Sequence, residues 1–185
     1  MRLATFSLTL AVLICFGASA RAEPSPPGAD RAALLGAARE IMTAVRYPAV
    51  VTVDASGRPQ ARVVDAFDPE PGMTVWFATN PKSRKVAQIR IDPRVTLYYF
   101  DPRDPGQGYV TLLGRARLVN EESEKQARWK EGWEAFWPDR GAGYLLVEVT
   151  PERLEIVSPD RGIDGDPVTW APPAVELGRE RPVKE

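Results

Sequence analysis

The segment 76–89 reads Trp76-Phe77-Ala78-Thr79-Asn80-Pro81-Lys82-Ser83-Arg84-Lys85-Val86-Ala87-Gln88-Ile89. It begins as an apolar strand, and Asn80 followed by Pro81 then predicts the cap and first residue of a helix. The helix amides would point back at the strand end, a geometry that attracts anions. Positive side chains in a first helical turn are unfavourable unless a bound anion offsets them. The basic residues 82–85 therefore predict a phosphate-sized ligand; the alternative is an exposed helix whose basic residues pair with nearby acids.

The chain on either side of this segment alternates short apolar runs with turn residues. Asp30 can cap a helix through residue 47, because apolar residues recur there at spacings of three and four. Six strands in short meanders favour a mainly β fold with flanking helices (α+β), as an antiparallel closed barrel rather than a doubly wound sheet. The expected strands are 49–54, 60–67, 73–78, 95–100, 109–119 and 144–157, with helices at 81–91 and 121–137.

The N-terminal 22 residues match a secretory signal peptide. Arg2 precedes an apolar run at 3–16, and Ala20-Arg21-Ala22 fits the cleavage site. The run is shorter than the ~20 residues that span a bilayer, so we expect no stable membrane anchor after cleavage. The sequence thus predicts a periplasmic or secreted protein.

Four segments are expected along the chain. Residues 1–22 are the signal peptide, 23–29 a flexible leader, 30–157 the folded domain, and 158–185 a Pro-rich tail without regular structure. The single cysteine, Cys15, would leave with the signal peptide.

Composition excludes several classes of site. The 185 residues contain no histidine, which removes histidine-based nucleophile systems and histidine-ligated metals, and no metal site is expected. Lys and Arg number 24 against 25 Asp and Glu, so the chain lacks the basic excess typical of a nucleic-acid-binding protein.

Five motifs follow one another along the chain: Arg62-Val63-Val64, Val75-Trp76-Phe77-Ala78-Thr79, Ser83-Arg84-Lys85-Val86, Asp92-Pro93-Arg94-Val95-Thr96-Leu97 and Tyr109-Val110-Thr111-Leu112-Leu113-Gly114-Arg115-Ala116. Their order and spacing resemble the FMN-binding split barrel of pyridoxamine 5'-phosphate oxidase-like proteins, over residues 32–157. Phe136-Trp137-Pro138-Asp139 resembles the general stress protein branch of that family.

The resemblance implies a six-stranded antiparallel split β-barrel that forms a homodimer with FMN at the subunit interface. It places Ser83, Arg84 and Lys85 on the phosphate-binding turn and Arg62 beside them. It places Phe77, Ala78 and Thr79 along the flavin ring, and Tyr109 and Thr111 on the strand that reaches the cofactor from the partner. For the strand residues, packing within the barrel is the alternative interpretation.

Two departures from the family pattern limit what can be transferred. Phe67 stands where a second basic residue is often found, and the C-terminal arginine pattern of true pyridoxamine phosphate oxidases is absent, so vitamin B6 synthesis is not expected. We therefore expect an exported FMN-binding oxidoreductase whose substrate and electron donor the sequence does not identify. The alternative is a noncatalytic flavin- or other ligand-binding, stress-related protein, with haem or deazaflavin as less favoured ligands.

Overall fold

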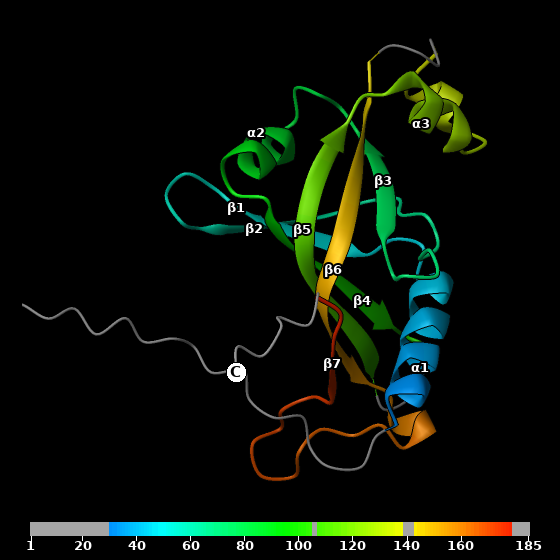
Figure 1. Cartoon of the computed structure of the whole chain (residues 1–185), viewed down its shortest axis with the longest axis vertical. Helices are drawn as coiled ribbons and strands as arrows, with labels where there is room; N and C mark the ends of the chain where they lie inside the picture. The colour runs from blue at the N-terminus through cyan, green and yellow to red at the C-terminus, as the bar shows by residue number, and fades with distance from the viewer. Residues whose placement is uncertain (1–29, 105–106, 139–142, 179–185) are drawn as a thin grey trace, which may run out of the picture.

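A computed structural model describes residues 30–104, 107–138 and 143–178, with three α-helices, seven strands and two 3₁₀ turns (Figure 1). The signal peptide and leader expected over residues 1–29 lie outside the described residues. The elements are α1 (Arg31–Ala44), β1 (Ala49–Val53), β2 (Pro59–Val63), β3 (Val75–Thr79), α2 (Arg84–Ile91), β4 (Arg94–Asp101), β5 (Gly108–Val119), α3 (Glu122–Ala127), η1 (Trp133–Ala135), β6 (Leu145–Val157), η2 (Pro159–Arg161) and β7 (Ala174–Glu176).

The strands form one antiparallel sheet in the order β2-β1-β4-β5-β6-β3, and β7 adds to β6. This confirms the mainly β, α+β split-barrel prediction. The expected closure is wrong, because β2 and β3 form no ladder, and only an isolated bridge joins Ala66, beyond the end of β2, to Phe77 of β3. The connection between these strands contains Pro69 and Pro71, which have no N–H to donate to a ladder. The sheet therefore curls without closing.

Helix α1 packs its apolar face against the inner side of the curled sheet. Leu34, Ala38 and Ile41 are buried there, and the Asp30 side chain caps the helix by accepting a hydrogen bond from the Ala32 N–H at 3.1 Å. The helix ends at Ala44 rather than at residue 47, because the Arg46 carbonyl accepts a hydrogen bond from the Ala66 N–H at 3.1 Å. The chain bends at residues 46–47, before Pro48, which disfavours a helical conformation of the residue that precedes it.

The single helix expected over residues 121–137 is broken. Helix α3 ends at Ala127, and Gly132 adopts φ 89°, a left-handed conformation that few other residues tolerate. The short η1 turn follows and buries Trp133, which makes an edge contact with Phe67 at 5.5 Å between ring centroids. Trp133 packs with Trp76, Val119 and Leu146 of the sheet, whereas Phe136 is 74% exposed.

Within residues 159–178 the chain forms a 3₁₀ turn and a strand, where we expected no regular structure. Strand β7 pairs with residues 153–155 of β6, while β3 pairs with residues 145–149, so β7 covers the stretch of β6 edge that β3 does not reach. Val175 in β7 is 3% exposed. An unpaired strand edge and a buried apolar side chain together explain why this segment folds back. Among the described residues, no helix is long and apolar enough to cross a membrane.

Candidate cofactor site

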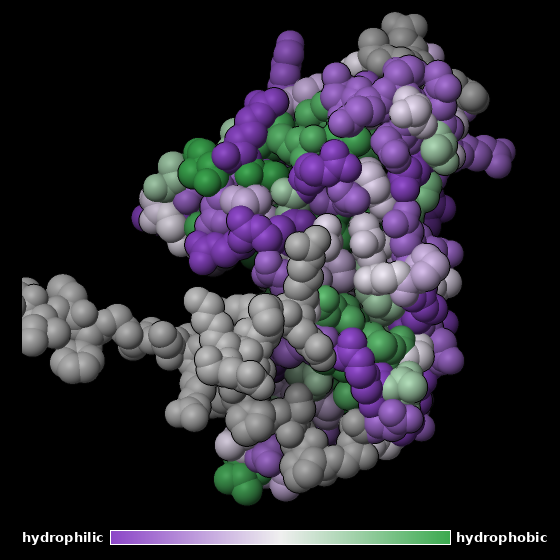
Figure 2. All heavy atoms as spheres, viewed as in Figure 1, coloured by the Kyte–Doolittle hydropathy of each residue, from purple (hydrophilic) through white to green (hydrophobic). Residues whose placement is uncertain are grey.

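Three cations predicted to bind phosphate gather where α2 lies beside the β1–β2 hairpin. Arg62 on β2 donates from Nη1 to Thr52 Oγ1 at 2.6 Å and from Nη2 to Gln88 Oε1 at 2.8 Å. The Thr52 hydroxyl also donates to Gln88 Oε1 at 2.5 Å. Thr52 and Gln88 are buried, so the Arg62 guanidinium is held in one position by two neutral side chains. Figure 2 shows hydrophilic side chains gathered over this hairpin.

Lys85 and Arg84 enter the same region from the first turn of α2. Lys85 Nζ donates to Thr79 Oγ1 at 2.8 Å, and the Thr79 and Ser83 hydroxyl oxygens lie 3.3 Å apart. Arg84 is exposed, with Nη1 3.5 Å from Gln60 Oε1. The structure therefore brings Arg62, Thr79, Ser83, Arg84 and Lys85 together, as predicted.

The start of α2 differs from the prediction. Asn80 does not cap the helix. Its side-chain oxygen accepts a hydrogen bond from the Lys82 N–H at 2.8 Å, and its backbone carbonyl accepts one from the Ser83 N–H at 3.0 Å. These bonds close a turn around Pro81, a local arrangement that asparagine favours. Ser83 becomes the N-cap residue, without a side-chain capping bond, and the helix begins at Arg84.

The positive charges of this cluster lie close together and lower one another's pKa. Burial lowers the pKa of Arg62, and the charge of Arg84 lowers it further. Burial likewise lowers the pKa of Lys85, with Arg62 adding to the effect. Within the described parts of the chain, no carboxylate forms an ion pair with Arg62, Arg84 or Lys85. We refer to these three residues as the unpaired cluster. A bound anion would offset the repulsion between these three positive charges, which no group of the protein neutralises among the described residues.

The three residues expected along a flavin ring differ in burial and in the side of β3 that they face. Phe77 is fully buried in the core, and its backbone pairs with Val147, so its side chain serves barrel packing. Ala78 is half-buried and points to the opposite side of β3. Thr79 is 4% exposed and ends the strand next to Lys85.

Tyr109 and Thr111 lie on the other face of the sheet from the unpaired cluster. Arg62 is directly opposite Val50, which is fully buried on the inner face. Thr111 is opposite Tyr98, which is 38% exposed, and the Tyr98 and Tyr109 rings lie 5.6 Å apart. Side chains directly opposite in adjacent strands share a face. One chain therefore does not bring these two residues to Arg62.

The outer face of strands β2, β1, β4 and β5 is largely apolar, and none of the described helices packs on it. Val63 is 64% exposed and Phe100 is 42% exposed on it, beside half-buried Val51 and Leu113. A broad apolar sheet face of this kind is typical of a surface that another protein surface covers.

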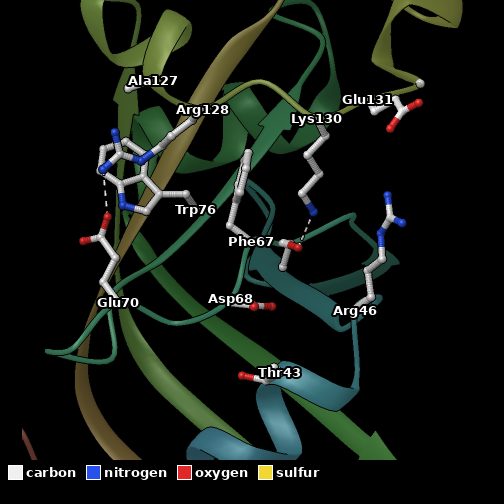
Figure 3. A pocket seen from close by; sticks show the side chains of 12 residues that line it. Thr43, Arg46, Phe67, Asp68, Glu70, Trp76, Ala127, Arg128, Lys130 and Glu131 are labelled. Carbon is white, nitrogen blue, oxygen red and sulfur yellow. Dashed lines mark hydrogen bonds and ion pairs between the residues drawn. The ribbon is translucent and has the colours of Figure 1, made fainter.

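A cavity of about 880 Å³ lies elsewhere, between the end of α1, the 65–70 segment and residues 127–132 (Figure 3). Its three cations, Arg46, Arg128 and Lys130, are paired with acids. Arg46 and Lys130 bind Asp65 at 2.8 Å and 2.6 Å, and Arg128 binds Glu70 at 2.7 Å while lying 3.8 Å from the centre of the Trp76 ring. We refer to these three residues as the paired cluster.

Asp65 is the centre of the paired cluster. Burial opposes its ionisation, but hydrogen bonds from Arg46, Lys130 and the Trp133 indole N–H hold the pKa of Asp65 well below its usual range. The sequence reasoning missed this network. One feature of the sequence pointed toward it: Phe67 stands where the family often has a basic residue. In the structure Lys130 supplies a positive charge at that place, with Nζ 4.5 Å from the centre of the Phe67 ring. The cations beside this cavity are already neutralised by acids, whereas those of the unpaired cluster are not.

Residues 34–158 match the family model described as pyridoxamine 5'-phosphate oxidase. The chain belongs to this family. No curated protein sequence matches the chain.

Solved structures share the fold at low sequence identity. A protein related to general stress protein 26 from Clostridium acetobutylicum is 20% identical, with a TM-score of 0.61, covering 70% of this chain and 91% of that one. A pyridoxamine 5'-phosphate oxidase-related, FMN-binding protein from Nostoc punctiforme is 18% identical, with a TM-score of 0.52 and coverage of 69% and 84%. A heme-binding protein from Mycobacterium smegmatis is 20% identical, with a TM-score of 0.53 and coverage of 65% and 53%.

Proposed function

We propose that this protein is an exported FMN-binding oxidoreductase that works as a homodimer. The observation that carries the proposal is the unpaired cluster: three cations, two of them partly buried, converge without a carboxylate beside two hydroxyl groups. A phosphate monoester supplies the missing charge and several acceptor oxygens. Membership of the family and the likeness to an FMN-binding protein support FMN as the ligand that carries this phosphate.

The residues present fit the FMN phosphate. Arg62 offers a fixed positive charge whose terminal nitrogens are held by Thr52, Gln60 and Gln88. Lys85 offers a point charge and Arg84 an exposed fork at the helix start, while Ser83 and Thr79 offer hydroxyl groups. Bound FMN would supply hydride or electron transfer, and the protein positions the ring and limits its access to water.

Two chains are needed for a complete site in this proposal. The unpaired cluster and the Tyr109 region face opposite sides of one sheet, and the apolar outer face provides the surface on which a second copy can pack. A dimer places Tyr109 and Thr111 of one protomer toward the phosphate end of its partner.

Haem is the second candidate ligand, because one structural relative binds heme. Haem iron is usually held by histidine or cysteine. The chain has no histidine, and its single cysteine, Cys15, lies in the predicted signal peptide. These absences favour FMN.

The test is to purify the exported protein, record its visible absorption spectrum and titrate it with FMN while measuring mass by light scattering. We expect a flavin spectrum, one FMN per chain and the mass of a dimer, with a mature N-terminus near Glu23. A haem spectrum, or a monomer saturated with FMN at micromolar concentration, would overturn the proposal.

A further inference from the structure

The segment after β6 carries a fixed loop that lies beyond the residues matched by the family model. The match ends at residue 158, whereas the chain continues through η2 and a loop to β7, below the sheet in Figure 1. The loop is anchored at its start, because buried Ser158 donates to Asp104 Oδ2 at 2.9 Å. Family membership therefore assigns no role to this loop.

Hydrogen bonds close the loop over residues 166–171. The Asp166 N–H donates to the Ala171 carbonyl at 2.9 Å, and the Trp170 N–H to the Asp166 carbonyl at 2.8 Å. The Asp166 carboxylate accepts from the Thr169 N–H at 2.7 Å. This fixed backbone presents two apolar side chains to solvent: Val168 is 85% exposed and Trp170 is 80% exposed.

Trp170 forms one wall of a cavity of about 500 Å³ on the outer face of the sheet. The facing walls are the rings of Tyr98, Phe100 and Tyr109. Trp170 has φ 61° and Gln107, at the cavity edge, has φ 63°. A positive φ is costly for such residues and is maintained where the surrounding structure imposes it, often at ligand sites.

Four aromatic rings around a cavity of this size suit a planar aromatic ligand. Asp166 is the one charged residue among those that line this cavity. Its carboxylate is engaged by hydrogen bonds within its own loop, so it does not recognise a charged ligand. The cavity also contains Tyr109, which lies on the face that a second copy would cover.

We propose that Trp170 of one protomer stacks on the isoalloxazine ring of the FMN whose phosphate is held by the unpaired cluster of the partner. The C-terminal loop is then a cofactor-contacting arm added to the family's barrel. This inference rests on the proposed function, because it needs both FMN and the dimer.

The matched variants are Trp170→Ala and Val168→Ala, two truncations of exposed side chains in one loop. Stacking of an aromatic side chain on a planar heterocycle typically corresponds to a roughly tenfold change in affinity. We expect Trp170→Ala to weaken FMN and riboflavin by about that same factor and to increase the fluorescence of bound flavin. Val168→Ala should change neither quantity, and Trp170→Phe should restore part of the affinity.

Light scattering and thermal unfolding of each variant separate the possible failures. Equal affinities in wild type, Trp170→Ala and Val168→Ala would overturn the inference while leaving the proposed function intact. Dissociation of the dimer by Trp170→Ala would assign Trp170 to a protein contact instead, and would equally overturn it. A wild-type protein that binds no flavin would overturn both.

Discussion

The molecule contains two clusters of three cations with opposite surroundings. In the paired cluster, carboxylates of Asp65 and Glu70 neutralise the charges. In the unpaired cluster, the neighbours are neutral: Thr52 and Gln88 hold Arg62, and Thr79 holds Lys85. The members are Arg46, Arg128 and Lys130 in the first and Arg62, Arg84 and Lys85 in the second.

This difference separates cations that stabilise the fold from cations kept for a ligand. A partly buried ion pair is satisfied within the protein, and removing one partner leaves the other uncompensated. Cations held by neutral groups keep their charge available, at a cost that an anion reverses on binding. Substitutions in the two clusters should therefore act on different quantities.

The largest effect is expected from Asp65→Ala in the paired cluster. It leaves Arg46, Lys130 and the Trp133 indole N–H without their shared acceptor, so the free energy of unfolding should fall by roughly 2–4 kcal/mol. Urea unfolding measures this. FMN affinity should stay within about twofold of wild type, and a large loss of affinity in a folded variant would break the distinction between the clusters.

The same residue predicts how stability depends on pH. The pKa of Asp65 is lower in the folded chain than in the unfolded one, so its stabilising contribution is complete above the unfolded value of about 3.9 and is lost as pH falls below it. Wild type should lose more stability than Asp65→Ala between about pH 5 and pH 3. Parallel acid unfolding curves would contradict the assignment.

Arg84→Ala should act on FMN binding and leave stability unchanged. The lost charge-assisted contact, worth roughly 1.5–3 kcal/mol, corresponds to about a tenfold to hundredfold weaker FMN affinity, whereas riboflavin affinity should barely change. The matched control is Arg90→Ala, which removes an exposed arginine from the other end of α2. Equal losses for FMN and riboflavin in Arg84→Ala would show that Arg84 supports the structure instead.

Gln88→Glu would convert the unpaired cluster into a paired one. The new carboxylate would stand where Gln88 Oε1 now lies, 2.8 Å from Arg62 Nη2. We expect roughly tenfold weaker FMN binding, because the new carboxylate competes with the phosphate for the Arg62 guanidinium. The control is riboflavin, which lacks the phosphate and whose affinity should be unchanged in this variant. Unchanged FMN affinity in the glutamate variant would mean that Arg62 does not meet the phosphate.

Arg46→Ala should have the smallest effect. Its side chain is 53% exposed, so the loss of its ion pair with Asp65 is expected to lower the stability only slightly. Asp65 keeps Lys130 and the Trp133 N–H as partners. Thermal unfolding measures the change. A loss as large as that of Asp65→Ala would mean that Arg46, rather than Asp65, organises the paired cluster.

Local patterns predicted much of the fold and the basic residues that gather at the unpaired cluster. The alternation in residues 109–119 and 144–157 gave strands close to β5 and β6, and the basic turn after residue 79 marked the unpaired cluster. Features that depend on distant partners escaped prediction. Asp65 meets Lys130, 65 residues later, and β7 forms because part of the β6 edge is left open by β3. Neither contact leaves a periodic signal.

Some local errors had competing local causes. Asn80 can cap a helix or close a turn, and the hydrogen bond from the Lys82 N–H favoured the turn. The sequence predicted one continuous helix over residues 121–137, whereas the chain leaves the helix after Ala127 and Gly132 adopts the left-handed conformation.

The central claim is that the unpaired cluster binds a phosphate, and the most direct test is the ratio of FMN to riboflavin affinity in the wild-type protein. The two ligands share the ring and differ in the phosphate. Calorimetric titration at low and high salt should show FMN binding at least about tenfold more tightly than riboflavin, with the preference shrinking as salt rises. Equal affinities for the two ligands at low salt would contradict the account.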